Sequence, residues 1–121
     1  MIKTQGLTHI HLMVEDLDRS THFYQSVFGM ETLFRQGPDM IFMRTPGSDD
    51  MITLHRRHDG EEVGAMGSIQ HFGFQHAEGT DFDQAIAEIE AAGGKLLKRG
   101  KHGESDSYAY VTDPDGYVIE I

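Results

Sequence analysis

Histidine dominates the reactive side chains of this 121-residue chain, which has eight histidines and no cysteine. Without cysteine there is no thiol nucleophile and no cysteine-bound zinc, so imidazole and carboxylate remain as metal ligands. Two imidazoles and one carboxylate from three different strands form the facial triad typical of non-haem Fe(II) sites, which leaves coordination positions open for substrate. We expect strand alternation to gather these side chains on one concave surface: His9, His11, His55, His71, Tyr110 and Glu120.

The first half of the chain predicts the elements that carry the first three histidines of that set. Apolar residues alternate with His9 and His11 over 6–14, which is the period of a half-buried strand. Asp16 caps a following helix, which ends at Gly29. Three more short strands are expected at 30–35, 40–45 and 51–56.

The same order of elements begins again after a polar, glycine-containing linker at 57–67. A strand is expected over 69–76, and a second helix begins at Thr80 or Asp81 and ends near Gly93. Three closing strands are expected at 95–98, 107–112 and 117–121, with 99–106 as a long polar loop.

The chain is therefore expected to form one α+β domain of two βαβββ modules, about 1–60 and 67–121. His9 and His71 both lie midway in the first strand of a module. If the modules pair about a pseudo-two-fold axis, these two histidines face each other. Glu120, in the last strand of the second module, then lies on the same surface.

Composition and charge exclude several classes of partner. The formal net charge of −10 opposes tight binding to nucleic acid and docking on an anionic membrane. The longest unbroken apolar runs have four residues, so neither a transmembrane helix nor a secretory signal is expected. The absence of cysteine is typical of a cytoplasmic protein.

Three motifs in a fixed order identify a family resemblance. They are HIHLMVED at 9–16, HFGFQ at 71–75 and DPDGYVIE at 113–120. In this order and spacing they resemble the vicinal oxygen chelate superfamily, also called the glyoxalase/bleomycin resistance/extradiol dioxygenase family. The resemblance spans the whole chain. It implies paired βαβββ modules whose curled mixed sheets form half-barrels around a metal site, and a homodimer.

The resemblance also implies a ligand set. The family's metal ligands fall on His9, His71 and Glu120, which would hold a divalent ion, Fe2+ first and Mn2+, Ni2+ or Zn2+ as alternatives. The family's fourth ligand position is Glu or Gln in glyoxalase-I-like members and falls here on Thr53, which is a poor ligand and no base. Tyr110 matches an active-site tyrosine of extradiol dioxygenases and of fosfomycin-modifying enzymes.

These implications predict an enzyme acting on a small molecule that chelates the metal through adjacent oxygens. Because the acid/base carboxylate is missing, we expect extradiol-type ring cleavage first, with His11 or His55 taking a proton and Tyr110 hydrogen-bonding a substrate oxygen. Two alternatives stay open. One is a glyoxalase-like lyase or isomerase with Ni, Zn or Mn, and the other is a metal-free protein that binds drugs, like the bleomycin-resistance members.

Overall fold

The computed structural model describes residues 1, 3, 5–64, 67, 69–104 and 106–121. Along this part of the chain the order strand, helix, strand, strand, strand occurs twice. The strands form two mixed four-stranded sheets, one from each half. The predicted α+β class with two βαβββ modules is therefore confirmed, although part of the linker predicted at 57–67 lies outside the described residues.

The first module builds one sheet from β1 (Ile10–Val14), β2 (Glu31–Gln36), β3 (Met40–Arg44) and β4 (Ile52–Arg56). The strand order is β1-β4-β3-β2. β1 runs parallel to β4, whereas β3 is antiparallel to both of its neighbours. Residues in register across a parallel pair project from the same face, so His11 and Thr53 lie side by side.

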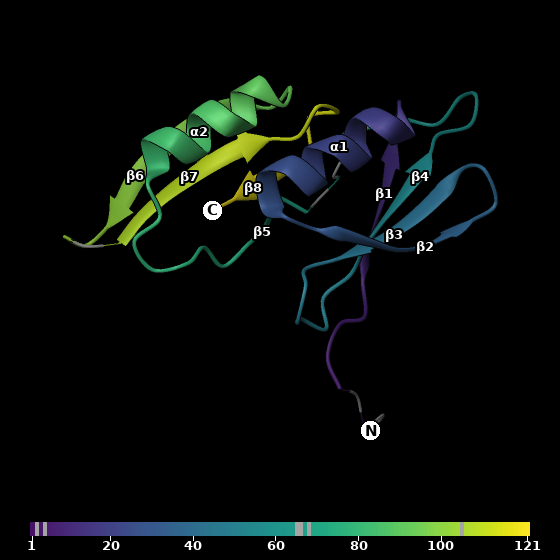
Figure 1. The fold of residues 1–121 in the computed structure, drawn as a ribbon, viewed down its shortest axis with the longest axis horizontal. Helices are drawn as coiled ribbons and strands as arrows, with labels where there is room; N and C mark the ends of the chain where they lie inside the picture. The colour runs from purple at the N-terminus through teal and green to yellow at the C-terminus, as the bar shows by residue number, and fades with distance from the viewer. Residues whose placement is uncertain (2, 4, 65–66, 68, 105) are drawn as a thin grey trace.

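The second module repeats this plan with β5 (Phe72–Gly73), β6 (Lys95–His102), β7 (Asp106–Thr112) and β8 (Val118–Glu120). The strand order is β5-β8-β7-β6, with β5 parallel to β8. Glu120 is in register with Gly73 on one side and with Tyr110 on the other. The hairpin of β6 and β7 extends away from the rest of the molecule (Figure 1).

Three predicted boundaries differ from the structure. The strand predicted over 6–14 begins at Ile10, so His9 lies just before β1 and not midway in it. The strand predicted over 69–76 is reduced to β5. β5 lies at the edge of its sheet and pairs with β8, which is only three residues long. The long polar loop predicted over 99–106 is wrong, because β6 continues to His102 and β7 begins at Asp106. β6 is an edge strand, so its exposed charged side chains resemble those of a loop in the sequence.

The helices α1 (Leu17–Phe28) and α2 (Phe82–Ala91) begin at predicted caps. Asp16 and Asp81 accept hydrogen bonds from backbone N–H groups of the first helical turn. Gly29 ends α1 with φ of 64°, a left-handed conformation that glycine adopts without strain. Within the described ranges, no helix has the length and apolarity needed to cross a bilayer.

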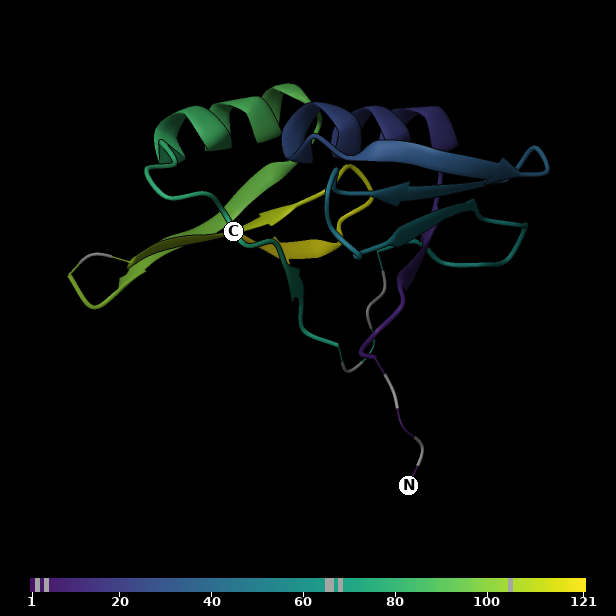
Figure 2. The ribbon, with the colours of Figure 1, turned by 60° about the horizontal axis from the view of Figure 1, so that its bottom comes forward.

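Both helices lie on the same side of the sheets (Figure 2). The hydrophobic core fills the space between them and the strands, and it is continuous across the two modules. Burial of each large apolar side chain there contributes about 1.5–3 kcal/mol to folding. The opposite faces of the sheets are left to carry polar side chains. The almost completely buried core residues include Phe23, Tyr24, Ile41, Leu54, Ile89 and Ile119.

A polar contact ties α1 to the turn between β7 and β8. The Tyr24 hydroxyl donates a hydrogen bond of 3.0 Å to Oδ2 of Asp113, and both residues are buried. Burial raises the pKa of Asp113 to about 6, even though its carboxylate accepts hydrogen bonds. Asp115 in the same turn accepts hydrogen bonds from Arg19 and Ser20 of α1. The two modules are thus joined at a titratable group.

Candidate functional site

The second module brings together an imidazole, a carboxylate and a phenol. Nε2 of His71 lies 2.9 Å from Oε2 of Glu120, and both side chains are about a quarter exposed. The Tyr110 ring stands edge-on to the His71 ring, with 4.9 Å between the ring centroids. Glu120 and Tyr110 face the same way because β7 and β8 place them in register.

Two neighbouring groups act on this cluster. Nδ1 of His71 lies 3.1 Å from Oε1 of Gln70, so each ring nitrogen of His71 faces an oxygen that can accept a hydrogen bond. The pKa of Tyr110 is raised, first by partial burial and then by the charge of Glu120, so the phenol keeps its proton. Gln70 is not among the residues expected from the sequence, where its position next to His71 is the single signal.

The first module brings together two imidazoles. Nε2 of His11 and Nδ1 of His55 share a hydrogen bond of 3.2 Å. They meet because β1 and β4 are parallel, and His55 is in register with Met13, two residues beyond His11. Partial burial, then the proximity of His55 and His9, lowers the pKa of His11. A neutral imidazole at this place is a proton acceptor near neutral pH.

Thr53 lies on the same face, in register with His11 on β1 and with Phe42 on β3. Its side chain is fully buried, and within the described residues its Oγ1 has no hydrogen-bond partner. Buried hydroxyls are normally paired, so an orphan oxygen marks a position where water, a ligand or another chain completes the structure.

The two clusters lie on different sheets. The described residues contain no group of three His, Cys, Asp or Glu side chains that could hold a metal ion. His9 instead lines a cleft of about 220 Å³ with Phe72 and Gly73. Glu120 lines another hollow, of about 510 Å³, with Tyr108; the two hollows share the stretch 73–75. The single concave surface expected from the sequence is therefore divided in one chain into a His71–Glu120–Tyr110 part and a His9–His11–His55 part.

Comparison with known proteins identifies the family. The model of the Glyoxalase/Bleomycin resistance protein/Dioxygenase superfamily matches residues 6–121. The chain belongs to this superfamily. The membership predicted from the three motifs is thereby confirmed. Among curated relatives, the lactoylglutathione lyase of Neisseria meningitidis (serogroup A) is 32% identical over 124 residues, with 95% of this chain and 88% of the relative covered.

Solved structures agree with this superfamily fold. A glyoxalase-related enzyme from Fulvimarina pelagi matches with a TM-score of 0.79 at 26% identity, covering 98% of this chain and 87% of that one. A variant of the fosfomycin resistance protein FosX from Listeria monocytogenes matches with a TM-score of 0.74 at 23% identity, covering 98% and 91%. That protein was solved in complex with Mn(II) and dihydroxypropylphosphonic acid.

Proposed function

We propose that this protein is a divalent-metal-dependent lyase or isomerase of the glyoxalase type, acting on a small molecule with adjacent oxygen atoms. The observation that carries the proposal is the 2.9 Å approach of His71 Nε2 and Glu120 Oε2, with Tyr110 beside them. The curated relatives that are 32% identical are named lactoylglutathione lyases. They favour this reaction over the ring cleavage that the sequence alone ranks first.

The donor atoms fit a divalent ion. His71 Nε2 and Glu120 Oε2 lie 2.9 Å apart, the length of a charge-assisted hydrogen bond, so these two donors would hold an ion that replaces the proton between them. Imidazole with carboxylate suits Fe2+, Mn2+, Ni2+ and Zn2+ alike, so the donor set does not select among them.

His9 completes the ligand set in this proposal, and it comes from a second copy of the chain. One chain keeps His9 apart from the His71–Glu120 pair. The face that carries Thr53 also carries the stacked Phe34 and Phe42 rings, with centroids 4.3 Å apart and Phe34 51% exposed. An exposed aromatic pair beside polar functional groups suits burial in a homodimer.

The side chains divide the chemistry between them. The ion, when bound, polarises the adjacent substrate oxygens as a Lewis acid. Isomerisation of a hemithioacetal moves a proton between neighbouring carbon atoms, and Thr53 cannot carry it. The His11–His55 pair takes this proton and returns it, because a neutral imidazole accepts and releases protons near neutral pH. Tyr110 keeps its own proton and donates a hydrogen bond to a substrate oxygen.

Extradiol-type ring cleavage is the second candidate. One observation favours it: Thr53 at the fourth position leaves two histidines and one glutamate, the set typical of non-haem Fe(II) oxygenases. In that reaction His11 or His55 would accept a phenolic proton, which is easier to remove than one on carbon.

The test combines metal analysis with two assays. We expect the purified protein to contain a divalent metal, and the metal-depleted protein reloaded with Ni2+ or Zn2+ to isomerise a hemithioacetal. Oxygen uptake with a catechol panel by the Fe2+ form, without isomerisation by any form, would overturn the lyase in favour of the dioxygenase. Failure to take up Fe2+, Mn2+, Ni2+ or Zn2+ would overturn both and leave the metal-free binding protein.

A further inference from the structure

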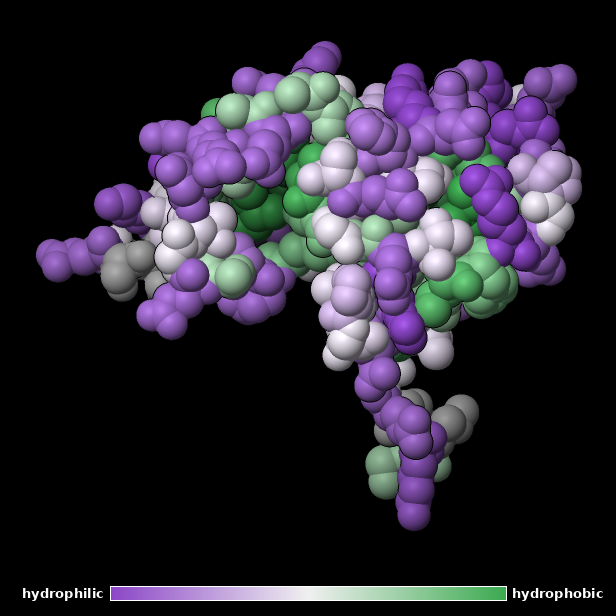
Figure 3. All heavy atoms as spheres, in the orientation of Figure 1, coloured by the Kyte–Doolittle hydropathy of each residue, from purple (hydrophilic) through white to green (hydrophobic). Residues whose placement is uncertain are grey.

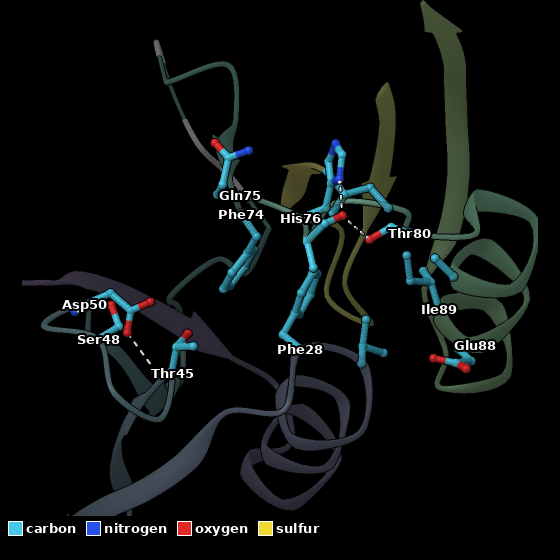
Figure 4. A pocket seen from close by; sticks show the side chains of 14 residues that line it. Phe28, Thr45, Ser48, Asp50, Phe74, Gln75, His76, Thr80, Glu88 and Ile89 are labelled. Carbon is cyan, nitrogen blue, oxygen red and sulfur yellow. Dashed lines mark hydrogen bonds between the residues drawn. The ribbon is translucent and has the colours of Figure 1, made fainter. Parts of the chain in front are cut away.

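A third hollow, a cleft of about 410 Å³, opens where the two modules meet. Its walls come from the end of α1, the turn between β3 and β4, the segment after β5, and α2 (Figure 4). In the space-filling view, green apolar atoms lie set back in a hollow beneath α2 (Figure 3). None of the candidate site residues is among its described lining residues, and the cleft borders the hollow of Glu120, with which it shares Phe74, Gln75, His76 and Ile121.

The floor of the cleft is apolar. The rings of Phe28 and Phe74 stack with centroids 4.0 Å apart and planes within 11°. Aliphatic side chains continue this surface on either side of the two rings. The volume lies within the roughly 300–1,000 Å³ of small-molecule pockets, which are also lined mainly by apolar and aromatic groups. The aliphatic lining residues are Val27, Ala85, Ile89 and Ile121.

The rim of the cleft is acidic. Asp50 and Glu88 lie on opposite sides of the two rings (Figure 4), and no Lys or Arg is among the described lining residues. Neither carboxylate forms an ion pair with Lys or Arg within the described part of the chain. Oδ1 of Asp50 accepts a hydrogen bond of 2.8 Å from the Thr45 N–H, and Oε1 of Glu88 accepts one of 2.9 Å from Gln84. These bonds hold both charges in place.

We propose that this cleft binds an organic cation, namely a protonated amine on an apolar, partly aromatic body. The body would cover the Phe28 and Phe74 surface and release water from it. The ammonium would lie near Asp50 or Glu88, whose charges no Lys or Arg among the described lining residues offsets. Aromatic rings attract cations through their negative faces, whereas the acidic rim and the net charge of −10 repel anions.

Three ligands of one shape and different charge test the proposal. The probes are 4-phenylbutylamine, 4-phenylbutanol and 4-phenylbutyrate, titrated into the full chain and followed by two-dimensional amide NMR. We expect the amine to shift signals of cleft residues and to bind up to about fivefold more tightly than the alcohol, the upper end for a contact between exposed charges. The carboxylate should bind weakest of the three.

Variants of the two rim carboxylates test whether these groups produce the preference for the amine. We expect the double variant Asp50→Asn, Glu88→Gln to bind the amine no better than the alcohol, with affinity for the alcohol unchanged. Glu90→Gln is the matched control, because Glu90 is an exposed carboxylate on α2 that does not line the cleft. This control should keep the full preference for the amine.

Three results would overturn the proposal. Equal binding of the amine and the carboxylate would remove the argument from charge. Amine-induced shifts confined to the surroundings of His71 and Glu120 would assign the ligand to the other site. The third result is that the amine does not bind at high protein concentration, while cleft signals shift when the protein is diluted. A second copy of the chain would then be the occupant of the cleft.

Discussion

The last strands of the two modules carry different chemistry at equivalent places. Thr53 on β4 is fully buried and its hydroxyl oxygen has no partner in the described structure. Glu120 on β8 is partly exposed, and its carboxylate meets His71. Both residues stand next to a parallel first strand of their module, β1 or β5. The backbone plan repeats, whereas the ligand chemistry does not.

The proposed reaction needs both metal binding and proton transfer, and the two modules carry the residues for one each. The second module places an anionic and an imidazole donor within 2.9 Å of each other, which is suited to a metal ion. The first module places two imidazoles, His11 and His55, in hydrogen-bond contact, which is suited to moving a proton. We infer that neither face is sufficient alone, and that the active molecule joins one face to the other across a dimer.

The largest expected effect comes from removing the anionic donor. Glu120→Gln should lower metal affinity by more than the roughly 10–100-fold that loss of an outer-shell partner costs, and turnover should fall to background. Metal content after dialysis and isothermal titration with Zn2+ measure this. His22→Ala, an exposed histidine on α1, is the control and should retain metal. Full metal retention by Glu120→Gln would move the ion away from the second module.

Mixing two inactive variants sharpens the comparison between the faces. His9→Ala and Glu120→Gln should each bind little metal alone. If each site takes His9 from one subunit and His71 with Glu120 from the other, a mixed dimer regains one intact site. Random exchange then restores roughly a quarter of all sites, because about half of the dimers are mixed and one of the two sites in each mixed dimer is intact. Metal content measured after co-refolding checks this, and no recovery would place the whole ligand set within one chain.

Loss of one imidazole on the first module should slow turnover without releasing metal. We expect His55→Ala, and separately His11→Ala, to reduce kcat by roughly 10²–10⁴-fold, the usual size of a general acid–base contribution. Metal content should stay at the level of the unmodified protein. A variant that loses its metal along with its activity would show that these residues ligate the ion, contrary to their assignment.

Local signals made most of the fold predictable. Asp16 and Gly29 mark the ends of α1 because a cap and a left-handed glycine act on the backbone next to them. The extent of β6 was not predictable, because Arg99 and Lys101 lie on an edge strand where exposed polar side chains carry no burial pattern. β5 was overestimated because its length depends on its partner strand, β8.

The candidate residues were predictable as types, but their grouping was not. The register of β1 with β4 puts His11 and Thr53 on one face, and the register of β7 with β8 puts Tyr110 beside Glu120. Whether His9 joins His71 depends on how modules pack, in one chain or between two, and no local signal encodes that relation. Gln70 was missed for the same reason, since its contact with His71 is a matter of side-chain placement.

The junction of the modules predicts a pH dependence of stability. The pKa of Asp113 rises on folding from 3.8 to about 6, chiefly through burial, so the folded state favours the protonated form. This contribution is fully present below about pH 4 and is lost as the pH rises through about 6, a change of about 3 kcal/mol. Asp113→Asn should abolish that decline in the free energy of unfolding.

Urea unfolding from pH 4 to pH 8 measures this dependence. The protein concentration is held fixed, because the stability of the proposed dimer would depend on it. Asp49→Asn on the exposed turn between β3 and β4 is the control and should keep the decline. An unchanged pH profile in Asp113→Asn would mean that the carboxylate is ionised in the folded protein throughout the range, and that the tie to Tyr24 is charged.

The smallest expected effect concerns the orphan hydroxyl. Thr53→Val keeps the shape and removes a buried oxygen without a partner, whose desolvation costs about 1–3 kcal/mol. The free energy of unfolding should therefore rise by about 1 kcal/mol. Thr21→Val is the matched control, because the buried Thr21 hydroxyl donates a hydrogen bond of 2.6 Å to the Leu17 carbonyl, and its loss should be destabilising. If Thr53→Val instead loses as much stability as Thr21→Val, the Thr53 hydroxyl is hydrogen-bonded in solution. Water or a second copy of the chain would then reach Thr53, at the position where the second module carries Glu120.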